Sequence, residues 1–145
     1  LWLEFRRVLF RSKNEVKSWG GENIIIDPET KAVIVDMSVE KYDEYVNNLK
    51  LKLEKCMEDI KTDNKKYPSI SDVKANDELN EFDIYCKKGI RMEKTISAIE
   101  LYLDSATYQV FKGVPQKDAT VDINYIDEET GDIIETMNTS QLVSK

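Results

Sequence analysis

The sequence predicts an α+β protein in which a long antiparallel helical hairpin of coiled-coil type is flanked by two β-hairpins. The two β-hairpins are expected to form a small antiparallel sheet at one end. Three observations lead to this fold class. Apolar residues recur at alternating steps of three and four along two long segments, which is typical of helices that pack along a seam. Each outer segment carries two β-branched runs around a turn. The connection between the helical segments is short, which makes the helices antiparallel neighbours.

The composition limits the function classes. The chain has 145 residues, a formal net charge of -7 and no histidine. This length suits one domain, and we assign residues 13–145 to a single α+β domain. Without histidine the chain lacks the commonest general base and the commonest metal ligand. The acidic balance argues against direct nucleic-acid binding, which depends on Lys and Arg. No apolar run approaches the roughly 20 residues of a membrane span.

Residues 1–12 are interpreted as foreign to the protein. Within them, residues 3–12 read LEFRRVLFRS and resemble the in-frame translation of a widely used short-read sequencing adapter. The alternatives are a native basic amphipathic start or a targeting peptide, although a signal peptide needs a longer apolar stretch and a small-residue cleavage site. On the adapter interpretation, the native sequence begins near Lys13, lacks its own start, and derives from an assembled environmental or gut sample.

The first two elements follow from local patterns. Residues 23–36 predict a β-hairpin, because two β-branched runs surround a turn that contains Pro28. Residues 38–62 predict a helix with Ser38 as its N-cap. The apolar seam of this helix comprises Val39, Tyr42, Val46, Leu49, Leu53, Cys56 and Ile60.

Residues 72–112 predict a second helix, which follows a polar stretch interrupted by Pro68. Gly89 lies inside this helix and should weaken it by about 1 kcal/mol relative to Ala. Leu101 and Tyr108 lie off the seam, which indicates that the C-terminal half is covered on a second face. The seam comprises Phe82, Tyr85, Gly89, Met92, Ile96, Ile99, Leu103, Ala106 and Val110.

Residues 119–137 predict the second β-hairpin, with Gly131 available for a left-handed position in its turn. The turn repeats the first hairpin, since residues 26–30 and 126–130 share four of five identities. We interpret this near-repeat as convergent turn chemistry.

No motif assembles a catalytic, cofactor-binding or metal-ligating set, so we predict no such residues and no cofactor. Cys56 and Cys86 have no Cys-x-x-Cys spacing and are interpreted as buried thiols, with a disulfide across the helical hairpin as the alternative. One acidic turn lacks the spacing of a calcium loop and is interpreted as solvated. It contains Asp127, Glu128, Glu129 and Asp132.

Four further features have weak functional interpretations. Trp19 and Tyr67 are candidate exposed aromatics, although packing is the preferred interpretation for both. Gly20 and Gly21 do not form a phosphate loop, and Asn138 opens a glycosylation sequon that matters only in a secreted protein. A lysine cluster is either a solvated loop or a docking patch for an acidic partner. It contains Lys61, Lys65, Lys66 and Lys74.

These observations favour a non-enzymatic protein-interaction or structural module that binds a protein partner or forms a homo-oligomer, with no direct contact to nucleic acid or membrane. The frequent use of Lys, Asn, Ile, Asp and Tyr, together with the environmental origin inferred from the adapter segment, suggests a phage or mobile-element protein. Such a protein would be cytoplasmic in a microbial host or associated with a virion. The alternative is a small acidic inhibitor that mimics phosphates toward a nuclease or nucleic-acid-binding partner. Its carboxylates would be Glu40, Asp43, Glu44, Glu54, Glu58 and Asp59, which alternate with Lys41, Lys50, Lys52 and Lys55.

Overall fold

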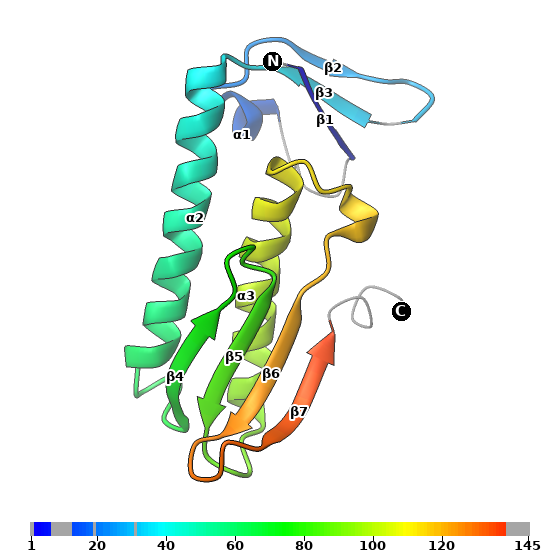
Figure 1. The fold of residues 1–145 in the computed structure, drawn as a ribbon. Coiled ribbons are helices and arrows are strands. Elements are labelled where there is room, and N and C mark those ends of the chain that lie inside the picture. The colour runs from blue at the N-terminus through cyan, green and yellow to red at the C-terminus, as the bar shows by residue number, and fades with distance from the viewer. Residues whose placement is uncertain (1, 7–12, 19, 31, 139–145) are drawn as a thin grey trace. The chain divides into compact units, whose positions relative to one another are not determined.

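The computed structural model describes residues 2–6, 13–18, 20–30 and 32–138 (Figure 1). The chain divides into two compact units, Leu1–Leu49 and Lys50–Lys145. Helix α2 (Val39–Thr62) begins in the first unit and ends in the second.

The first unit contains a small antiparallel sheet. Its strands are β1 (Trp2–Arg6), β2 (Ile24–Ile26) and β3 (Ala32–Asp36), in the order β1-β3-β2, and a short helix α1 (Lys13–Ser18) lies between β1 and β2 in the sequence. Strands β2 and β3 pair antiparallel within the range predicted for the first hairpin. The buried apolar residues of this unit are Val16, Ala32, Val33, Val35 and Met37.

The second unit is built on a four-stranded mixed sheet. Its strands are β4 (Ile70–Ala75), β5 (Glu81–Cys86), β6 (Asp122–Asp127) and β7 (Ile133–Asn138), in the order β4-β5-β6-β7. The outer pairs are antiparallel, whereas β5 and β6 are parallel. Parallel neighbours need a crossover connection, which here is provided by helix α3 (Met92–Phe111) and the short 3-10 helix η2 (Gln116–Asp118).

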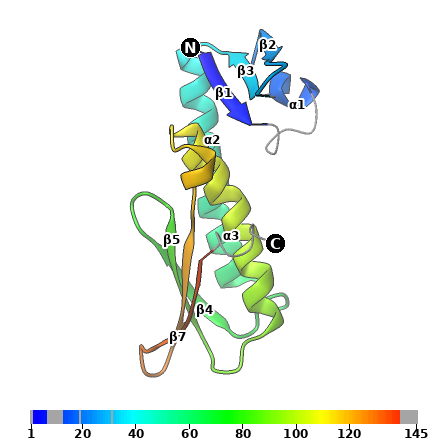
Figure 2. The same ribbon diagram turned by 90° about the vertical axis from the view of Figure 1, so that its right-hand side faces the viewer.

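The core of this unit lies between the sheet and its helices, and Figure 2 shows α3 packed along one side of the sheet. Burial follows the strand period of two, because alternate residues of a strand point to opposite faces. Phe82, Ile84 and Cys86 on β5 are fully buried, and so are Ile123 and Tyr125 on β6. The helices contribute Leu53, Ile60, Ala98 and Leu101 to the same cluster.

The predicted architecture is wrong. The protein is mixed α and β, but it has no long antiparallel helical hairpin flanked by two β-hairpins. The helix predicted at 72–112 is instead a β-hairpin followed by the shorter α3. The two predicted β-hairpins also do not share one antiparallel sheet, since β2 and β3 belong to one sheet and β6 and β7 to the other.

Turn chemistry explains why residues 70–86 form strands. The side-chain oxygen of Asn76 accepts hydrogen bonds from the backbone N–H groups of Asn80 and Glu81, at 3.0 and 3.1 Å. Leu79 adopts φ = 57°, a left-handed conformation that reverses the chain before β5. Along β5 the buried residues Phe82, Ile84 and Cys86 then alternate with residues that are less buried. This period of two takes precedence over the apparent heptad through Phe82 and Tyr85.

Gly89 does not lie in a helix. Its φ of +87° belongs to the left-handed region that glycine adopts without strain. It lies in the connection between β5 and α3, so the predicted position of Gly89 inside a helix is wrong. In the C-terminal half of this segment the off-seam face is buried as predicted, because Leu101 is buried and Tyr108 packs against the core. The expected cover on the seam face as well is wrong, since Ile99 and Leu103 are exposed.

Candidate functional site

The face of α3 that points away from the core carries exposed apolar side chains. Met92, Ile99 and Leu103 are 77%, 46% and 58% exposed. A helix turns about 100° per residue, which places these three side chains within about 40° of one another and opposite Leu101. We call Met92, Ile99 and Leu103 the outer stripe. The opposite face of the same helix is buried through Ser97, Ala98, Leu101, Ser105, Gln109 and Phe111.

Acidic side chains border the outer stripe on one side. Glu93 accepts hydrogen bonds from the backbone N–H and hydroxyl of Ser69, at 2.9 and 3.0 Å. Asp104 forms a 2.6 Å ion pair with Lys52 on α2. Helical spacing places Glu93, Glu100 and Asp104 on the same flank of α3, and we call these three residues the acidic border. On the opposite flank, Thr95 and Tyr102 occupy the corresponding positions.

A groove of about 660 Å³ lies beside the acidic border. One wall comes from α2 and the other from α3, and Leu103 connects the groove to the outer stripe. The groove carries four carboxylates against three lysines, so its charge is mixed. Its lining residues are Lys52, Lys55, Cys56, Asp59, Asp63, Lys66, Tyr67, Glu100, Leu103 and Asp104.

Tyr67 and Lys66 fix the position of Glu100 in this groove. The Tyr67 hydroxyl donates to Glu100 Oε2 at 2.6 Å, and Lys66 forms an ion pair with Oε1. Burial by itself would raise the pKa of Glu100, but the hydrogen bonds from Lys66 and Tyr67 outweigh it and hold the pKa below its ordinary value. Burial, followed by the bond to Glu100, raises the pKa of Tyr67 to about 12. The cluster therefore holds a protonated phenol against an ionised carboxylate.

The two thiols are free and poorly suited to nucleophilic chemistry. Burial, followed by the nearby carboxylates of Asp104 and Glu100, raises the pKa of Cys56 to about 12. Burial also raises the pKa of Cys86 to about 11. Since the thiolate is the nucleophile, both shifts disfavour reaction near neutral pH.

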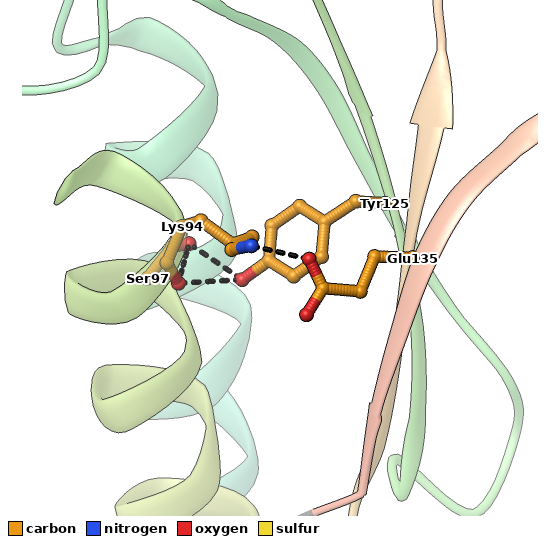
Figure 3. Close-up of polar contacts among 4 residues, drawn as sticks. All are labelled: Lys94, Ser97, Tyr125 and Glu135. Atoms are coloured by element: carbon orange, nitrogen blue, oxygen red, sulfur yellow. Dashed lines mark hydrogen bonds and ion pairs between the residues drawn. The ribbon is translucent and has the colours of Figure 1, made fainter. Parts of the chain in front are cut away.

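A polar cluster inside the unit joins α3 to the sheet (Figure 3). The Tyr125 hydroxyl donates to the backbone carbonyl of Lys94 at 2.6 Å and lies 3.1 Å from the hydroxyl of Ser97. The Lys94 ammonium group forms an ion pair with Glu135 on β7. Burial raises the pKa of Tyr125 above its ordinary value. These contacts join the first turns of α3 to β6 through Tyr125 and to β7 through Glu135, so the cluster stabilises the packing of α3 on both strands.

The acidic turn is only partly the solvated turn that the sequence predicted. Glu128, Glu129 and Asp132 are exposed, whereas Asp127 is buried. Asp127 forms a 2.9 Å ion pair with Lys88 and accepts a hydrogen bond from the backbone N–H of Glu129. The Lys88 ammonium group and this N–H hold the pKa of Asp127 below its ordinary value. Asp127 is therefore a structural residue of the turn.

The other candidates from the sequence are dispersed. Three of the four clustered lysines have partners: Lys61 pairs with Asp72, Lys66 with Glu100, and Lys74 lies over the Tyr85 ring. Tyr67 is buried, which confirms packing as the preferred interpretation for this residue. Trp19 and the end of the Asn138 sequon lie outside the described residues. The six carboxylates of the acidic-inhibitor alternative are all exposed, but Glu54 pairs with Lys50.

Sequence reasoning missed the outer stripe because it assigned the same residues to an internal seam. Met92, Ile99 and Leu103 follow the predicted heptad spacing, yet α2 meets α3 along the flank that carries Glu100 and Asp104 and does not cover these three side chains. The second apolar face, marked by Leu101, was visible in the sequence, but both faces were expected to be covered, whereas the structure buries only the Leu101 face.

Comparison of the chain with protein-family models, with curated proteins and with solved structures gives no match. Across the described residues, no group of three or more His, Cys, Asp or Glu side chains is placed to hold a metal ion. Within the same residues, no helix has both the length and the apolarity to cross a membrane.

Proposed function

We propose that this chain is a non-enzymatic protein-interaction module, and that its binding surface is the outer stripe of α3. The single observation that carries the proposal is the exposure of Met92, Ile99 and Leu103 on a helix whose opposite face is already buried. These exposed side chains lie outside the core of the unit and do not stabilise it. A cluster of exposed apolar residues on a polar protein is a typical contact site.

The spacing of the apolar residues favours a helix as the bound element. Met92, Ile96, Ile99, Leu103, Ala106 and Val110 follow alternating steps of four and three. This repeat is the pattern by which one helix packs against another. A partner helix would lay its own apolar residues between these side chains, as helix-in-groove complexes do.

The contacts beside the outer stripe favour a binding surface that is formed before a partner arrives. The Lys52–Asp104 ion pair and the Tyr67–Glu100 hydrogen bond connect α3 to α2 and to the segment that follows α2. Since Glu100 and Asp104 flank the stripe, these contacts hold its border in place before any partner binds. A preorganised surface loses less conformational entropy on binding.

Selection from a displayed library of amphipathic helical peptides tests the proposal. Peptides selected on the wild-type protein should lose binding to the double variant Ile99→Glu, Leu103→Glu, because the new charges cannot be buried without a partner. The matched control is Ile133→Glu, Ile134→Glu, which changes two exposed isoleucines on β7.

The control variant should bind the selected peptides as the wild type does. If every selected peptide binds the α3 double variant as well as the wild type, the outer stripe is not the binding surface and the proposal is wrong.

A further inference from the structure

The acidic border lies along one side of the outer stripe only. Glu93 and Glu100 are seven residues apart, which puts them at equivalent positions in successive heptads. Asp104 extends the same flank toward the C-terminal end of α3. The opposite flank carries Thr95 and Tyr102 and has no charged side chain at those positions. A helix docked on the stripe would therefore have one acidic neighbour and one uncharged neighbour.

Lysine partners offset part of the charge of this border, since Lys66 pairs with Glu100 and Lys52 with Asp104, but three carboxylates against two lysines leave it with one net negative charge. Glu93 is bonded to Ser69, which is uncharged. Glu100 and Asp104 each pair with one lysine, but an ionised carboxylate offers about four acceptor positions. The whole chain has a net charge of -7, which adds a long-range attraction for a basic partner.

A second copy of the chain fits this surface poorly. In an antiparallel pair of identical α3 helices, the residues of the acidic border would face the same border of the other copy, so Glu93 and Glu100 would meet like charges. In a parallel pair they would face Thr95 and Tyr102, which provide no opposite charge. Net repulsion between two acidic chains adds to both cases.

From this arrangement we infer that the partner of α3 is a basic amphipathic helix, with apolar residues on one face and Lys or Arg along one flank of that face. The apolar residues cover the outer stripe, and the basic flank lies along Glu93, Glu100 and Asp104. This inference rests on the proposed function, to which it adds the chemistry of the partner.

Two designed peptides with the same apolar face test the inference. One carries Lys and Arg along a single flank, and the other carries Glu at the same positions. The basic peptide should bind roughly ten-fold more tightly at about 0.1 M salt, and the difference should shrink to less than about three-fold at about 1 M salt, where the Debye length is near 3 Å.

Two variants of the full chain show whether the preference for the basic peptide arises at the acidic border. Thr107→Lys adds a positive charge in line with the acidic border, whereas Thr95→Lys adds the same charge on the uncharged flank. The first should weaken the basic peptide several-fold and strengthen the acidic one, and the second should change the ratio between them by much less.

Equal binding of both peptides through the outer stripe would overturn the basic partner and leave the proposed function intact. Failure of both peptides to show binding that depends on Ile99 and Leu103 would count against the proposed function itself. Equal effects of Thr95→Lys and Thr107→Lys would show attraction to the whole acidic chain, not to the acidic border, and would also overturn the inference.

Discussion

Leu101 and Leu103 lie two positions apart on α3, yet Leu101 is fully buried and Leu103 projects from the other side of the helix. The buried leucine packs in the core with Ala98 and Tyr125, as part of the cluster between α3 and the sheet. The exposed leucine lies at the mouth of the groove between α2 and α3. One helix therefore has two apolar faces, and only one of them contributes to the fold.

Replacing Tyr67 with phenylalanine should destabilise the protein by about 1–3 kcal/mol, because the change removes a donor from Glu100 in a partly buried cluster. Urea unfolding measures the loss. The matched control is Tyr85→Phe, since the Tyr85 ring contacts Lys74 through its face and phenylalanine keeps that contact. Equal stability of the two variants would show that the Tyr67–Glu100 bond contributes nothing.

Tyr125→Phe should also cost about 1–3 kcal/mol, since its hydroxyl donates to the Lys94 carbonyl in the first turn of α3. Ser97→Ala touches the same cluster, and therefore the two effects should not add. A double-mutant cycle by urea unfolding checks the coupling between Tyr125 and Ser97. Strict additivity would contradict the shared network in Figure 3.

The lowered pKa of Asp127 leads to a specific prediction for acid unfolding. Its pKa is lower in the folded protein than the ordinary value of 3.8. The unfolded chain therefore binds this proton more readily, and the contribution of Asp127 to stability is present above about pH 4 and lost as pH falls through the lower folded pKa. Asp127→Asn should flatten the fall in unfolding free energy below about pH 4. An unchanged acid slope would contradict this role.

The Cys56 thiol should react slowly in the folded protein. Its pKa rises from 9.0 to about 12, so near neutral pH the thiolate population is about a thousand-fold smaller than that of an unshifted thiol. A variant with Cys86→Ser isolates Cys56, and alkylation by iodoacetamide at pH 8 measures its rate. Alkylation in urea provides the reference rate. Equal rates with and without urea would contradict the burial and charge assigned to the thiol.

Local patterns predicted some elements of the fold well. The β2–β3 hairpin, helix α2 and the β6–β7 hairpin each have one dominant period and a clear turn or cap. The Asp27 and Asp127 turns even share their chemistry, because in both the carboxylate accepts the backbone N–H two residues later, at 2.7 and 3.1 Å. Such features depend only on neighbours in the sequence.

The rest could not be predicted from those patterns. Phe82, Tyr85 and Met92 fit a heptad by spacing alone. Burial instead follows a period of two, in which Phe82 and Ile84 are buried and Tyr85 is less so. The parallel pairing of β5 with β6 joins segments about 40 residues apart, and no local signal reports it. The hydrogen bond from Tyr67 to Glu100 likewise joins residues 33 positions apart, so no local pattern reports it.

The central claim is that the outer stripe of α3 serves binding and not folding. The most direct test measures two properties of Leu103→Glu, its unfolding free energy and its affinity for peptides selected on the wild-type protein. Leu101→Ala is the companion variant on the buried face of the same helix.

The account predicts that Leu103→Glu changes the unfolding free energy by less than about 0.5 kcal/mol and loses peptide binding. It predicts that Leu101→Ala costs about 2–5 kcal/mol through the cavity that it leaves. A Leu103→Glu variant that is as destabilised as Leu101→Ala, or that binds the peptides with wild-type affinity, would contradict the claim.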